Sequence, residues 1–150
     1  NILETNTFGA SPLRLGEFDF KTIESSDMKG IPKNLDLNSA NFEAICLGLN
    51  EQACQIAHKA IAHYKTLPEC DSRPLYVAGS IGPSNYVVSS TQANLNKATF
   101  RQIVNNSYLQ VVGLIRGGAD ILLYETQQDI LELKAGLIGA QQAMKKMIDI

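Results

Sequence analysis

Polar side chains gather at the ends of three apolar runs in this sequence, and they include the residues best suited to chemistry. The polar segments are residues 4–9 (ETNTFG), 79–83 (GSIGP) and 125–126 (ET). Glu125 directly follows four apolar residues, and a carboxylate in that position is costly to bury unless it is paired or solvated. A cationic ligand would be a suitable partner. Alternatively, Glu125 caps the next helix or pairs with a surface lysine, so the residue pattern leaves both roles open.

Glu4 lies within its apolar run rather than after it. Side chains alternate between the two faces of a strand, so Glu4 and Asn6 point the same way, and we expect this to be the inner face of the sheet. Glu4 could then contribute to binding or form a structural pair with a basic group in another part of the protein. Gly79, Gly82 and Pro83 shape a tight turn, and ordinary loop geometry is enough to explain each of them.

Other residue patterns that resemble known binding sites are better explained by ordinary structural roles. The Gly79-x-x-Gly82 pattern lacks the Gly-Lys-Ser/Thr of a phosphate-binding loop and the third glycine of a dinucleotide-binding turn. His58 and His63 lie five positions apart on one helical segment, not on a common face, and we expect both to be exposed. The three cysteines match no metal-binding spacing and are expected to be reduced structural thiols in a cytoplasmic protein; they are Cys46, Cys54 and Cys70.

The elements that position these residues follow from the hydrophobic pattern. The three apolar runs, residues 2–8, 75–80 and 121–124, are predicted to be buried strands. Each is followed by a segment whose apolar residues recur at helical spacing, and these segments include residues 53–64, 100–115 and 130–144. Because strands and helices alternate, the predicted fold class is α/β, with parallel strands joined by right-handed crossovers.

Local signals mark where the helices begin and end. Thr99 with Gln102, and Asp129 with Glu132, have the spacing of capping boxes at helix starts, and Gly117-Gly118 predicts a left-handed stop. Residues 9–41 and 84–97 are long polar loops that follow predicted strands. Loops at the carboxyl ends of parallel strands are where α/β folds place their sites.

Composition narrows the function classes. The chain has 150 residues, 45% of them hydrophobic, and a formal net charge of −2, which gives no electrostatic case for binding nucleic acid or an anionic membrane. No apolar run approaches the roughly 18 residues that a membrane span requires, and no signal peptide is visible. The chain opens with Asn1 almost directly in a predicted strand, so we expect it to be a fragment of a larger protein.

Three motifs together carry a family resemblance. Residues 4–10 (ETNTFGA), 77–85 (VAGSIGPSN) and 117–126 (GGADILLYET) resemble the homocysteine-binding domain of the cobalamin-dependent methionine synthase family. The resemblance covers nearly all of the chain except residues 18–38, which look like an insertion. It implies part of a TIM (β/α)8 barrel, with strands 2–4 present and with the first strand and the C-terminal zinc-ligand half missing from residues 1–150.

The resemblance also implies a reaction and a site. In the full-length enzyme, a zinc-bound homocysteine thiolate would take a methyl group from methylcobalamin to give methionine, and the cobalamin- and folate-binding domains would belong to the same polypeptide. Glu125 would receive the homocysteine ammonium group, and Thr126, Asn6 and Thr7 would shape the polar pocket. No cysteine here stands in a zinc-ligand motif, so we expect no zinc or cobalamin bound to this chain, and no activity from it alone.

Two rival functions remain open from sequence. The first is a homocysteine S-methyltransferase that uses betaine or S-methylmethionine as methyl donor. The second is a non-catalytic α/β ligand-binding module. If the chain is part of a methyltransferase barrel, whichever the methyl donor, we expect three parallel strands covered on one side by three helices in an open arc. The unpaired strand edges and the apolar inner face would make the isolated chain prone to associate.

Overall fold

The computed structural model describes residues 1–17 and 42–148 of the chain. Along the chain its elements are β1 (Ile2–Glu4), α1 (Pro12–Leu15), α2 (Phe42–Tyr64), β2 (Tyr76–Ile81), α3 (Phe100–Gly117), β3 (Ile121–Tyr124) and α4 (Ile130–Ile148). The insertion expected at residues 18–38 lies outside the described residues. No helix in the described ranges is long and apolar enough to cross a membrane.

The strands form one parallel sheet with β2 in the centre. The order is β1-β2-β3, with Glu4 opposite Ala78 and Ser80 opposite Leu123. The predicted α/β class with parallel strands is therefore confirmed, and it is consistent with three βα units of a barrel. In the described part of the chain β1 and β3 are the sheet edges, so the sheet is open, as expected.

β1 is shorter than predicted. It ends at Glu4 rather than residue 8, because side chains replace the backbone in the hydrogen bonds that follow. Thr5 N–H still donates to Ala78 O at 2.9 Å, but Ser80 N–H donates to the Thr5 hydroxyl at 3.1 Å instead of to a backbone carbonyl. β2 begins and ends one residue later than predicted, and β3 has the predicted bounds.

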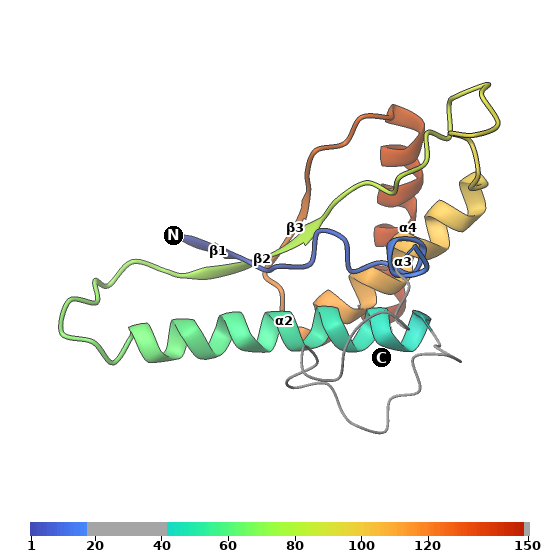
Figure 1. Cartoon of the computed structure of the whole chain (residues 1–150). Coiled ribbons are helices and arrows are strands. Elements are labelled where there is room, and N and C mark those ends of the chain that lie inside the picture. The colour runs from blue at the N-terminus through green and yellow to red at the C-terminus, as the bar shows by residue number, and fades with distance from the viewer. Residues whose placement is uncertain (18–41, 149–150) are drawn as a thin grey trace, which may run out of the picture.

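The two faces of the sheet differ in what covers them. Val77 and Ile81 of β2 are buried with Leu114 of α3 in the main core, and Figure 1 shows the three long helices grouped on one side of the strands. The alternate residues point to the other side, which we call the open face. Its large apolar residues are 36–63% exposed; they are Ile2, Tyr76, Ile121 and Leu123. The prediction of buried strands is therefore wrong for β1 and β3, because no layer of the described chain covers this face.

Close helix approach places α3 between α2 and α4. A Cβ on Gly117 would lie 2.6 Å from Glu51 O of α2, and one on Gly139 would lie 2.4 Å from Val104 O of α3. Contacts this short leave no room for any side chain but hydrogen. The three helices therefore form one closely packed layer, from which polar side chains of α3 and α4 reach the strand ends.

The predicted helix boundaries are confirmed at α3 and corrected at α4. Thr99 and Gln102 make the reciprocal capping box, and Gly118, with φ 88°, ends the helix in the left-handed conformation. Asp129 does cap α4, because its Oδ1 accepts Leu131 N–H at 2.9 Å. Glu132 does not complete that box; its carboxylate instead accepts Ser84 N–H from the loop after β2 at 2.7 Å.

The loops and the two histidines differ in part from the sequence predictions. The predicted loop at residues 9–41 contains the short helix α1 in its described part, whereas residues 84–97 form no helix or strand. His63 is exposed as predicted, but His58 is half-buried. The prediction fails at His58 because its Nε2 lies 2.7 Å from Gly118 O, where it interacts with a carbonyl at the end of α3.

Candidate functional site

Glu125 follows β3 and lies in line with the open face of the sheet. Its Oε1 accepts a hydrogen bond from the Ser80 hydroxyl, and the Glu4 carboxyl lies within hydrogen-bond reach. These contacts, with that of Ser80 the largest, lower the pKa of Glu125. The carboxylate is half-buried and ionised at neutral pH. Because Asp129 caps α4, Glu125 is not used as a helix cap, and its charge is available to a ligand.

Glu4 adds a second carboxyl group to this location. It stands opposite Ala78 in the sheet register, so it points to the open face, as the alternation predicts. Two neighbouring carboxyl groups repel one another when both are charged, and a cation placed between them offsets that repulsion. The pair with Glu125 is therefore suited to an ammonium group.

Thr126 has an unusual backbone conformation. Its φ is 54°, a left-handed value that is rare for a β-branched residue and is typical of strained functional positions. The Thr126 hydroxyl donates to Glu125 Oε2 at 3.4 Å. The strained turn thus redirects the chain directly after Glu125 and contributes to the orientation of its carboxylate.

Thr7 and Asn6 lie at the end of β1 in different environments. Asn6 is exposed, whereas Thr7 is only 1% exposed. The Thr7 hydroxyl donates to Ser80 O at 2.8 Å and lies 2.7 Å from the Thr5 hydroxyl oxygen. Glu125 and Thr126 are therefore in direct contact. Thr7 is connected to Glu125 indirectly, because both residues are hydrogen-bonded to Ser80.

Ser80 belongs to the polar segment 79–83, but the sequence pattern predicts no role for it. Ser80 pairs with Leu123 across the sheet, and alternation then places it beside Glu125 on the open face. This register cannot be read from either strand alone, so the contact could not be predicted from the sequence.

Two side-chain amides, one buried and one half-buried, hold the strand ends in place. Gln110 of α3 is 1% exposed, and its Nε2 donates to Thr7 O at 2.7 Å and to Ser80 O at 3.4 Å. Gln127 donates to Ile81 O at 3.3 Å and to the backbone carbonyl of Glu125 at 3.1 Å. These bonds fix β1, β2 and β3 relative to one another at the carboxyl ends.

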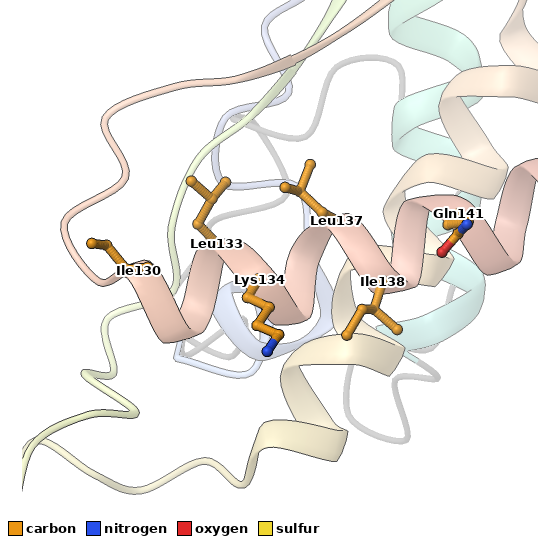
Figure 2. A pocket seen from close by; sticks show the side chains of 6 residues that line it. All are labelled: Ile130, Leu133, Lys134, Leu137, Ile138 and Gln141. Carbon is orange, nitrogen blue, oxygen red and sulfur yellow. The ribbon is translucent and has the colours of Figure 1, made fainter.

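A broad groove on α4 lies apart from this location. It is lined by Ile130, Leu133, Lys134, Leu137, Ile138 and Gln141, and Figure 2 shows these side chains along the outer side of the helix. None of the strand-end residues lines it. Its lining is mostly apolar and offers no carboxylate, so the strand ends remain the better candidate for binding a polar ligand.

Comparison with known proteins identifies the family. The family model described as homocysteine S-methyltransferase matches residues 1–150. The chain belongs to the homocysteine S-methyltransferase family. The chain is 30% identical over 145 residues to methionine synthase of Mycobacterium leprae, and 29% identical over 146 residues to methionine synthase of Mycobacterium tuberculosis. These matches cover 96% and 97% of the chain but only 9% and 10% of the relatives.

The resemblance inferred from the three strand-end motifs is therefore confirmed. The chain spans about a tenth of the length of the curated relatives it matches. Glu125, Thr126, Thr7 and Asn6 all lie within the matched residues.

The described residues of the chain do not group the ligands of a zinc site. Within the ranges that the structure describes, no three His, Cys, Asp or Glu side chains are grouped so that they could hold a metal ion. Cys46 and Cys54 are fully buried in α2, and burial raises their pKa to about 12 and about 11, respectively. Thiols held protonated in this way are suited to packing and not to metal ligation.

Proposed function

We propose that this chain is the homocysteine-binding part of a larger methyltransferase that methylates the homocysteine thiol to give methionine. The observation that carries the proposal is the ionised Glu125 carboxylate on the open face of the sheet, oriented by Ser80. Its environment suits the α-ammonium group of an amino acid. Membership in the homocysteine S-methyltransferase family supports homocysteine as that amino acid.

Each residue of the site has a distinct part in the proposal. Glu125 binds the ammonium group, and Glu4 is the second acceptor for it. Thr126 and Ser80 orient the Glu125 carboxylate. The Thr7 hydroxyl holds Ser80 by a hydrogen bond to its backbone carbonyl. The exposed Asn6 lies at the border of the proposed binding site. The chain thus binds and orients the substrate, and the described residues supply no group that would ionise the thiol.

The remaining chemistry is assigned to other parts of the complete protein. We propose that residues 1–150 are three βα units of a TIM-type barrel whose zinc ligands belong to strands outside this chain. Methylcobalamin is the proposed methyl donor, because the relatives reported above are methionine synthases. Cobalamin- and folate-binding domains in the same polypeptide are the corresponding proposed partners.

The test compares two ligands that differ only in the ammonium group. In the complete protein that contains this chain, Glu125→Gln should raise the homocysteine dissociation constant about tenfold or more, since a hydrogen bond to a charged group is lost. The same substitution should not change the affinity for 4-mercaptobutyrate, which lacks the amino group. Glu69→Gln, at an exposed loop position, is the matched control.

The outcome separates a binding role from a structural one. Equal weakening of both ligands would show that Glu125 supports the fold and does not bind the ammonium group. Homocysteine affinity within about twofold of the unaltered protein, a change too small for a lost charged contact, would overturn the assignment. Zinc content should be the same in all variants, because Glu125 is not proposed as a metal ligand.

A further inference from the structure

Glu132 is a buried carboxylate that the proposed binding site does not use. It lies in the first turn of α4 and is 6% exposed. Its Oε1 accepts the backbone N–H of Ser84 at 2.7 Å. Burial raises the pKa of Glu132 even though the bonds from Ser84 act in the opposite direction. A carboxylate is a costly acceptor in this environment, so capping of α4 does not explain its presence.

Asp129 makes a second attachment to the same loop. It is 5% exposed, and its Oδ2 accepts Ser89 N–H at 2.8 Å. Residues 84–89, which follow β2, are therefore held at both ends by carboxylates from the start of α4. The two contacts fix the path by which the chain leaves β2.

Gln127 also holds the end of β2. Its side chain donates to Ile81 O, and Gln127 and Glu132 line one small pocket together with Ile81 and Gly82. Gly82 N–H donates to Phe8 O at 3.1 Å. The segment 81–84 is thus hydrogen-bonded both to the chain after β1 and to the chain between β3 and α4. Ser80, the last residue of β2 that faces the open side, directly precedes this segment.

We propose that Glu132 is a positioning residue for the homocysteine site: by holding the Ser84 N–H it fixes the end of β2, and with it the Ser80 hydroxyl that orients Glu125. This inference rests on the proposed function, and it adds a residue that touches neither substrate nor the reacting atoms. It acts through the geometry of Ser80.

Three substitutions at Glu132 separate hydrogen bonding from charge. In the complete protein, Glu132→Gln keeps an acceptor of the same length, Glu132→Met removes it, and Glu132→Asp keeps the charge but is one methylene too short. We expect the Met and Asp variants to raise the homocysteine dissociation constant about threefold to tenfold, the range for one hydrogen bond. The Gln variant should stay within about twofold, and 4-mercaptobutyrate should bind all variants equally.

Hydrogen exchange supplies a readout that does not depend on the ligand. The Ser84 amide should exchange faster in the Met and Asp variants than in the unaltered protein, and Glu132→Gln should restore its protection. Glu69→Gln again serves as the control for loss of an exposed carboxylate.

Three other outcomes would overturn the inference, each for a different reason. If Glu132→Gln weakens homocysteine binding as much as Glu132→Met does, charge and not the acceptor is required. If Ser84 exchange accelerates while homocysteine affinity is unchanged, and Glu125→Gln still weakens binding, the positioning role is wrong and the proposed function stands. If the unaltered protein does not bind homocysteine, the proposed function fails and the inference fails with it.

Discussion

Replacing Thr7 with valine removes a buried hydroxyl and keeps the shape of the side chain. That hydroxyl lies 2.8 Å from Ser80 O and 2.7 Å from the Thr5 hydroxyl oxygen. Each such hydrogen bond contributes about 0.5–1.5 kcal/mol, so the two together contribute about 1–3 kcal/mol. Ser80 O keeps only the longer contact of 3.4 Å from Gln110, which is too weak to compensate fully.

The loss should appear at the strand ends. Native-state hydrogen exchange in the complete protein should show the Thr5 and Ser80 amides exchanging about fivefold to 150-fold faster in Thr7→Val, the range that corresponds to 1–3 kcal/mol. The homocysteine dissociation constant should rise as well, because Ser80 orients Glu125. Thr7→Ser is the control, since it keeps the hydroxyl and loses a methyl group.

The comparison of Thr7→Val with Thr7→Ser shows whether the hydroxyl group or the methyl group is responsible for the effect. If Thr7→Ser accelerates exchange as much as Thr7→Val, the methyl group and not the hydroxyl holds β1 against β2. If neither variant changes exchange at Ser80, the hydrogen bonds between the strand ends do not determine local stability, and the argument that Thr7 supports the site is refuted.

Four further predictions follow from burial and backbone geometry. Because the folded-state pKa of Glu132 is raised, Glu132→Gln should increase the thermal midpoint at pH 7, and the gain should vanish below the ordinary carboxyl pKa of about 4.3; an equal gain at pH 3 would contradict this. Thr126→Gly should relieve the strain of the positive φ and add up to about 1 kcal/mol of stability, as measured by denaturation, while weakening homocysteine binding. In native protein at pH 8, iodoacetamide should modify Cys70 first, and equal labelling of the buried Cys46 and Cys54, followed by mass spectrometry, would contradict the raised pKa of both thiols. The isolated chain should associate through its open face at micromolar concentration, and sedimentation of a stable monomer would count against this.

Much of the fold could be predicted because its signals are local in the sequence. The apolar runs and the helical spacing that follows each of them determine the βα order, and that order requires parallel strands. Thr99 and Gln102 lie three residues apart and specify the start of α3, and Gly118 specifies its end. Glu125 is a candidate for the same reason, since a carboxylate directly after an apolar run stands out without any knowledge of the remainder of the chain, and its role in binding stays a prediction.

The partners of these residues were decided only by tertiary structure. The Ser80–Glu125 bond joins residues 45 positions apart, and the Ser84–Glu132 bond joins residues 48 positions apart. Which residues meet at such separations depends on the register between strands and on the depth at which each helix packs. Glu132 has the spacing of a capping residue, yet the loop after β2 passes close enough for the part-buried Ser84 N–H to donate to it. A backbone N–H removed from water needs an acceptor, so the long-range contact replaces the local one.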